Sequence, residues 1–90
     1  MSLFEFNIME SKTIHVGQMI EREMERQEKS THWLAQEINR ERSTIYKIYH
    51  RESVDVYMLA RISVLLNHDF FKDLSEKVFD YRNNVESYSL

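Results

Sequence analysis

Apolar residues recur every three or four positions along most of this chain, which is the spacing of helices that bury one face. The first segment with this pattern runs from about His15 to Glu28, and charged residues separate its apolar positions. The second begins at Ser30 or Thr31, whose hydroxyl groups can cap a helix. It ends at Asn39, because asparagine tolerates the left-handed conformation of a helix end. The apolar positions of these two segments are Val16, Met19, Ile20, Met24, Leu34, Ala35 and Ile38.

Three further helices are expected in the second half of the chain. The pattern predicts one helix from about Arg42 to Tyr49, one that begins after the capping residue Asp55 and ends at Asn67, and one that begins after Asp69. Their inward positions are Ile45, Ile48 and Tyr49, then Leu59, Ile62, Leu65 and Leu66, then Phe70 or Phe71, Leu74, Val78 and Tyr81.

The two ends of the chain lack the helical period. Phe4, Phe6 and Ile8 alternate with polar residues, as they would in a short strand, and residues 82–90 show no apolar repeat. We therefore expect an N-terminal arm over residues 1–14, a helical domain over 15–81 and a C-terminal tail over 82–90.

The composition supports an all-α fold. Ninety residues form about one domain, and a hydrophobic content of 42% suffices for one small core. The chain has one glycine and no proline, the residues on which sheets with many hairpins depend. It has no cysteine, no run of about 18 apolar residues and no signal-peptide pattern, so we expect a cytoplasmic protein without a membrane segment.

Charge is divided unevenly along the chain. The formal net charge is −3, which by itself speaks against a nucleic-acid partner. The segment Arg40–Arg51 nevertheless carries +3, and the rest of the chain carries −6. The sign of a charged partner therefore depends on this one segment.

The stretch from Thr31 to His50 has the pattern of a helix-turn-helix. Ala35 is small where two helices would cross, Asn39 supplies the turn, and aliphatic residues fill the wedge between the helices. The outer face of the second helix would then protrude, and an α-helix fits the major groove of B-form DNA. That outer face is the basic one.

These residues make the chain resemble the lambda-repressor-like, or Cro/C1-type (Xre), helix-turn-helix domains of bacterial and phage regulators. The resemblance spans roughly residues 15–74 and looks closest to small single-domain members from Bacteroidetes. The motifs that carry it are His15-Val16-Gly17, Trp33-Leu34-Ala35, Ile45-Tyr46-Lys47-Ile48, Arg61-Ile62-Ser63 and Asp69-Phe70-Phe71. Two positions depart from the family: Asn39 stands where glycine is frequent, and Glu41 stands where serine or threonine commonly caps the second helix.

The resemblance implies a five-helix, lambda-repressor-like fold and a bacterial protein found with the nucleoid. It also implies a homodimer that binds double-stranded DNA at a short pseudo-palindromic operator. Such a protein regulates transcription, and we expect a repressor rather than an activator.

Helix geometry assigns roles within this segment as hypotheses. Arg42 could donate two hydrogen bonds to guanine O6 and N7, and Thr44 could touch a thymine methyl group or a phosphate. Glu41 would be repelled by phosphate unless Arg40 or Arg42 pairs with it. The expected phosphate contacts are the side chains of Ser43, Tyr46, Lys47, His50 and Arg51 and the backbone amides near Thr31 and His32.

Catalysis and metal binding have little support in the sequence. There is no glycine-rich phosphate loop and no recognisable catalytic triad, and the four histidines have no partner at metal-ligand spacing. We therefore expect no enzyme activity, no cofactor, no metal and no small-molecule effector. The charges from Glu21 to Glu28 are expected to form a solvated helix face, and Trp33 to lie at the edge of the core.

Two alternatives stay open at this stage. The apolar stripe through Leu74 and Val78 either completes the core of the monomer or faces a second copy. The chain could also be a protein-interaction module, such as an antitoxin or an accessory subunit with weak or no DNA binding, because the charge outside Arg40–Arg51 is acidic.

Overall fold

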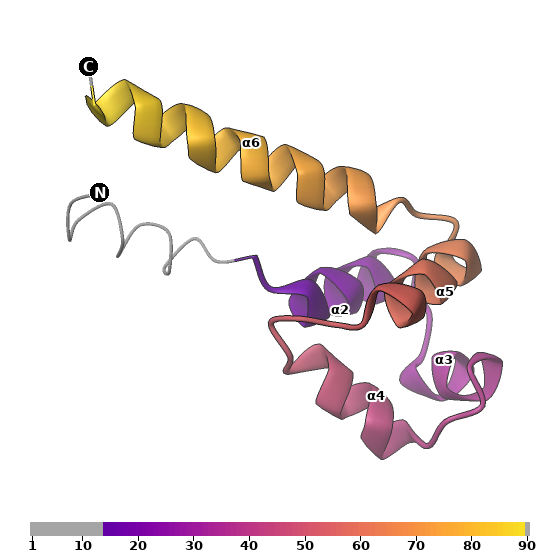
Figure 1. Cartoon of the computed structure of the whole chain (residues 1–90). Coiled ribbons are helices and arrows are strands. Elements are labelled where there is room, and N and C mark those ends of the chain that lie inside the picture. The colour runs from indigo at the N-terminus through magenta and orange to yellow at the C-terminus, as the bar shows by residue number, and fades with distance from the viewer. Residues whose placement is uncertain (1–13, 90) are drawn as a thin grey trace. The chain divides into compact units, whose positions relative to one another are not determined.

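A computed structural model describes residues 14–89 of the chain, with the side chains of residues 14–79. This part consists of five α-helices and contains no strand (Figure 1), so the prediction of an all-α fold is confirmed for it. The expected alternation of Phe4, Phe6 and Ile8 lies outside the described residues. The helices are α2 (Val16–Arg26), α3 (Thr31–Glu37), α4 (Arg42–Tyr49), α5 (Val56–Leu66) and α6 (Phe70–Ser89).

Three of the helices begin at a side chain that accepts a hydrogen bond from the first turn. The imidazole Nδ1 of His15 accepts from the amide of Gln18 at 3.1 Å. Ser30 Oγ accepts from the amide of Trp33 at 3.0 Å, and Asp55 Oδ1 accepts from two amides at the start of α5. Caps of this kind satisfy amides that have no partner within the helix. The predicted caps Ser30 and Asp55 are confirmed.

Three helices end at a residue with positive φ. Glu28, Asn39 and Asn67 have φ angles of 57°, 56° and 49°. In each case the next amide bonds back to a carbonyl five residues earlier, as in the donation from Arg40 to Ala35 at 2.9 Å. The stops predicted at Asn39 and Asn67 are confirmed, whereas Glu28 was not expected to occupy this conformation.

The core lies within residues 15–70, which form one compact unit. Of the two phenylalanines that could enter it, Phe70 is fully buried and Phe71 is exposed. Met19 and Leu65, both expected to point inward, are only half-buried. The buried apolar residues are Val16, Ile20, Met24, Leu34, Ala35, Ile38, Ile45, Ile48, Tyr49, Leu59, Ile62, Leu66 and Phe70.

Two sequence-based expectations are wrong. Glu23, placed on a solvated face, is 7% exposed, because it lies next to Met24 and meets the chain that follows α5. Residues 82–89, expected to form a tail, continue α6 to Ser89. No glycine or proline interrupts that helix, so nothing in its sequence ends it at residue 81.

The compact unit of residues 15–70 ends as α6 begins. Residues from Phe71 onward belong to a second compact unit. Among the described residues, no helix has the length and apolar character that crossing a bilayer would require.

Candidate nucleic-acid interface

Helix α4 presents two chemically different faces. Ile45, Ile48 and Tyr49 are buried and fix the inner face. With about 100° of rotation per residue, the remaining positions cover roughly half of the circumference. The exposed residues of this outer face are Arg42, Ser43, Tyr46, Lys47 and His50, and Arg51 follows directly after them. The structure therefore brings five of the predicted side-chain contacts onto one face, with Thr44 half-buried at its border, and the sixth, Arg51, is exposed just after the helix.

The cations of this face have no acidic partner among the residues whose side chains the structure describes. Within residues 14–79, Arg42, Lys47 and Arg51 form no ion pair with another residue. Glu41 at the start of α4 is exposed, makes no capping hydrogen bond and pairs with neither Arg40 nor Arg42. The face is thus positive, with one unpaired carboxylate at its edge.

Gly17 sets the position of α4 against α2. The amides of Val16 and Gly17 donate to the carbonyls of Glu52 and Arg51 at 3.0 and 2.9 Å. A Cβ atom on residue 17 would lie 2.2 to 2.7 Å from three carbonyl oxygens, the closest being that of Ile48. Only glycine allows this approach of two backbones. Sequence reasoning assigned no such role to Gly17, because the carbonyls that it meets lie more than thirty residues away in the chain.

A pair of hydroxyl groups ties α3 to α4. Thr31 Oγ1 and the Tyr49 hydroxyl are 3.1 Å apart and share a hydrogen bond. Burial raises the pKa of the Tyr49 phenol, so this group stays protonated at neutral pH. Tyr46 stacks edge-on against Tyr49 with ring centroids 6.0 Å apart. The side chain of Thr31 therefore serves the packing of the two helices. The phosphate contact expected here involves the backbone amides near Thr31 and His32, which this hydrogen bond does not engage.

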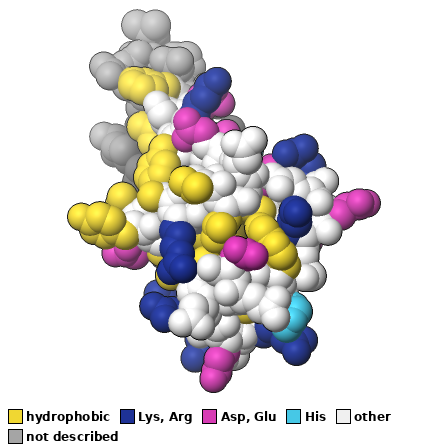
Figure 2. Space-filling model, turned by 90° about the vertical axis from the view of Figure 1, so that its right-hand side faces the viewer, with side chains coloured by type: hydrophobic (Ala, Val, Ile, Leu, Met, Phe, Trp, Pro, Cys, Tyr) yellow, Lys and Arg dark blue, Asp and Glu magenta, His cyan; other side chains and the backbone are white. Residues whose placement is uncertain are grey.

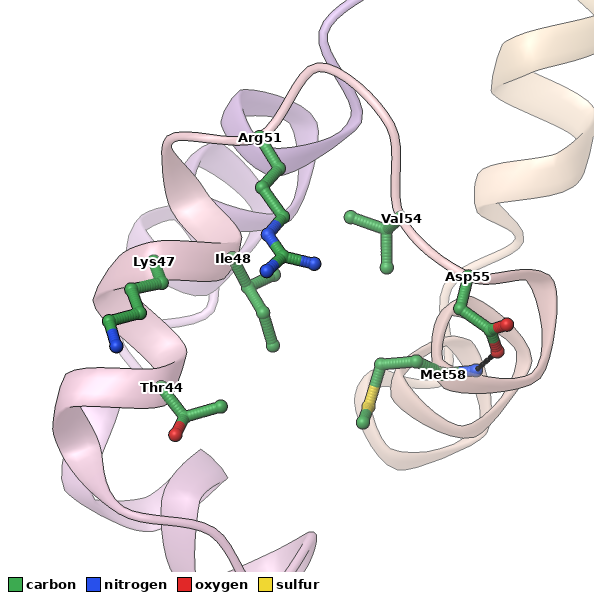
Figure 3. Close-up of a pocket in the computed structure, with 7 residues that line it drawn as sticks. All are labelled: Thr44, Lys47, Ile48, Arg51, Val54, Asp55 and Met58. Carbon is green, nitrogen blue, oxygen red and sulfur yellow. Dashed lines mark hydrogen bonds between the residues drawn. The ribbon is translucent and has the colours of Figure 1, made fainter.

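A groove of about 170 Å³ runs beside α4 (Figure 3). Arg51 extends toward Val54 in this groove, whereas Lys47 points away from Val54 and Met58. Asp55, also in the lining, is engaged as the cap of α5. The residues that line the groove are Thr44, Lys47, Ile48, Arg51, Val54, Asp55 and Met58. Its volume is below the roughly 300 Å³ at which pockets for drug-sized ligands begin.

A buried carboxylate joins the end of α2 to the end of α5. Glu23 accepts hydrogen bonds from the guanidinium of Arg26 and, at 2.6 Å, from Gln27 Nε2, which also donates to the Leu66 carbonyl at 2.7 Å. His68 Nδ1 lies 3.6 Å from the same carboxylate. The bonds from Arg26 lower the pKa of Glu23 to about 2, although burial opposes this shift. Sequence reasoning missed this cluster because its residues are polar.

The other sequence-based candidates occupy less distinctive places. His32 is exposed on α3, and Trp33 is half-buried with the Lys29 ammonium 4.8 Å from its ring centroid, consistent with the expected core edge. The described residues contain no cluster of three or more groups that could hold a metal ion.

Figure 2 shows one face of the molecule, where Lys and Arg side chains lie among exposed hydrophobic ones.

Comparison with known proteins leaves the family open. No protein-family model, no curated protein and no solved structure matches this chain. The function therefore has to be argued from the residues and the geometry above.

Proposed function

We propose that this chain is a lambda-repressor-like helix-turn-helix protein that binds a specific sequence of double-stranded DNA through α4. The observation that carries the proposal is that Arg42 and Lys47 on α4, and Arg51 just after it, are exposed and form no ion pair within residues 14–79. Helix α3, the turn at Asn39 and α4 form the supporting unit. An exposed helix of this kind fits the major groove. Its cations replace the counterions bound to the DNA phosphates, and the release of these counterions favours binding.

Specificity is assigned to the start of α4. Arg42 occupies its first turn and has a guanidinium that can donate in parallel to guanine O6 and N7. Thr44 lies at the border of the face, where its methyl group can meet that of thymine. These two residues read base edges in the proposal.

Affinity is assigned to the rest of the face. Ser43, Tyr46, Lys47, His50 and Arg51 are exposed and can bind phosphate oxygens. Tyr46 is 53% exposed although it stacks on Tyr49, so its hydroxyl can reach outward. The amides of Thr31 and His32 at the start of α3 are proposed to hold one more phosphate, since Ser30 caps a later amide, that of Trp33.

The proposed biological unit is a homodimer on a pseudo-palindromic operator, which acts as a transcriptional repressor in the bacterial cytoplasm. Two copies double the phosphate contacts and place two α4 helices about 34 Å apart, one turn of DNA. No enzyme activity, cofactor or metal forms part of the proposal.

Selection of bound duplexes from a random pool tests the specificity. The expected result is an enriched pair of related half-sites. Arg42→Ala should then relax the preference at one base pair per half-site by roughly 1 to 3 kcal/mol, while Arg22→Ala, which removes an equal charge from the exposed surface of α2, should leave it unchanged. A pool without enrichment would contradict sequence-specific binding.

A protein-interaction module, such as an antitoxin or an accessory subunit, is the second candidate. It is favoured by two large apolar side chains, Tyr57 and Val64, that are exposed on α5. Retention on heparin at low salt distinguishes the candidates. Retention that is lost in Lys47→Ala and Arg51→Ala supports the regulator, and no retention of the native chain supports the interaction module.

A further inference from the structure

The last turn of α3 leaves one backbone carbonyl without an amide partner. Within the described part of the chain, three of its last four carbonyls accept hydrogen bonds from the amides of residues 38–40, whereas the carbonyl of Glu37 accepts none from the backbone. Arg61 of α5 fills this place, because its Nη2 atom donates to the Glu37 carbonyl oxygen at 3.2 Å. A helix end whose carbonyls lack partners depends on such side chains or on water.

Arg61 also supplies a positive charge that the end of α3 lacks. Helix α3 has no basic residue in its last turn, and its last residue, Glu37, is acidic. The carboxyl end of a helix carries a partial negative charge, so a cation stabilises it and an acid does not. Arg61 therefore serves a helix end that the residues of α3 leave unfavourable.

The chain leads from this end directly into the proposed DNA-binding helix. Asn39 turns the backbone with a φ angle of 56°, and α4 begins at Arg42. Glu41 stands at the N-cap of α4 but makes no capping hydrogen bond, whereas α2, α3 and α5 each begin at a side chain that does. The direction in which α4 starts therefore depends on the turn that precedes it.

Helix α5 is a firm base for the contact with Glu37. Leu59 and Ile62, which lie near Arg61 in this helix, are 2% and 0% exposed. The side chain of Asp55 caps the start of the helix. A side chain that extends from an anchored helix can hold a neighbouring turn in one place.

We propose that Arg61 is a positioning residue for Arg42: it holds the turn after α3 and so sets the direction from which Arg42 approaches a base pair. This deepens the proposed function, on which it rests for the role of Arg42. The hold on the turn is a property of the free protein. A guanidinium donates two parallel hydrogen bonds to guanine only when its plane matches the base, so a shift of the helix start reduces discrimination.

Hydrogen exchange of the free chain tests the hold on the turn. Arg61→Ala removes the donor and keeps α5, since alanine has the highest helix propensity. The amides of Asn39 and Arg40, which donate within the turn at 3.2 and 2.9 Å, should exchange roughly fivefold faster, as expected for the loss of one net hydrogen bond. The amide of Gly17, bonded to the chain after α4, is the internal reference and should be unchanged. Arg22→Ala, which removes an equal charge from α2, should accelerate none of these amides.

Base preference tests the consequence for Arg42. Dissociation constants are measured for the selected duplex and for one changed at the base pair that Arg42 reads, and their ratio should shrink at least roughly threefold in Arg61→Ala. The slope of log K against log salt should stay at its native value, because Arg61 contacts no phosphate in this proposal. A slope reduced by about one unit would make Arg61 a phosphate contact and would overturn the proposal.

The remaining outcomes also decide the question. Unchanged exchange in the turn, equal acceleration at Gly17 or a native base preference in Arg61→Ala would overturn the proposal. Faster exchange in a chain that binds no duplex would remove the proposed function and leave the role of Arg61 in the turn standing. Unchanged exchange in a chain that binds duplex would remove this inference alone.

Discussion

Replacement of the single glycine tests how α4 is held. In Gly17→Ala, the new Cβ would lie 2.2 Å from the carbonyl oxygen of Ile48, 2.5 Å from that of Tyr49 and 2.7 Å from that of Arg51. All three are backbone atoms, which cannot rotate away as the end of a side chain could. To bring the shortest contact to 3.0 Å, the two helices must separate by at least about 0.8 Å.

The expected loss of stability has two parts. A separation of this size breaks the hydrogen bonds from Val16 and Gly17 to the chain after α4, each worth about 1 kcal/mol. Overpacking in a close-packed region adds about 1 to 3 kcal/mol. The higher helix propensity of alanine offsets up to about 1 kcal/mol of this loss of stability. The free energy of unfolding should therefore fall by roughly 2 to 4 kcal/mol, a large share of the stability of a small domain.

Urea unfolding followed by the fluorescence of Trp33, the only tryptophan, measures this loss. Gln18→Ala serves as control, because it places alanine at the next, exposed position of α2. The same displacement should weaken DNA binding, since the carbonyls concerned end α4. If Gly17→Ala were as stable as the native chain or more stable, as helix propensity alone predicts, the close approach of α2 and α4 would be refuted.

Three further predictions concern single side chains. Because the folded state lowers the pKa of Glu23 from 4.5 to about 2, its ionised carboxylate stabilises the fold above about pH 4.5, and this contribution is lost as the pH falls toward 2. The free energy of unfolding should fall by about 1 to 2 kcal/mol across this window in an acid titration, a figure reduced because Arg26 is largely exposed. Glu23→Gln should remove this pH dependence. Glu28→Gly should raise the free energy of unfolding by roughly 1 kcal/mol, because glycine takes positive φ without strain, and an unchanged urea midpoint would contradict this. Glu41→Ser should tighten duplex binding severalfold and steepen its salt dependence, because it removes a negative charge at the edge of the basic face. Equal or weaker binding in an anisotropy titration would place Glu41 away from the phosphates.

Local signals in the sequence predicted most of the helical elements. Ser30 and Asp55 act as caps, and Asn39 and Asn67 end helices, because these residue types satisfy backbone groups within a few positions of themselves. The buried positions of α4 followed from the period alone. Such features depend on near neighbours in the chain, so the pattern suffices to find them.

Features that depend on distant contacts could not be predicted. Gly17 meets carbonyls from another helix, and Glu23 is buried because Arg26, Gln27 and His68 surround its carboxylate. A rule that assigns charged residues to the surface fails at such a cluster. The outer face of α4 was predicted as a face, but only the structure shows that its cations have no protein partner within residues 14–79.

The salt dependence of duplex binding measures whether the exposed cations of α4 contact DNA phosphates. Labelled duplex is titrated with the native chain, Lys47→Ala and the charge-matched control Arg22→Ala at several salt concentrations. Lys47→Ala should weaken binding to every sequence and reduce the slope of log K against log salt by about one unit, while Arg22→Ala should change neither. A native chain that binds no duplex at low salt, or a Lys47→Ala variant with the native slope, would refute DNA binding by these cations.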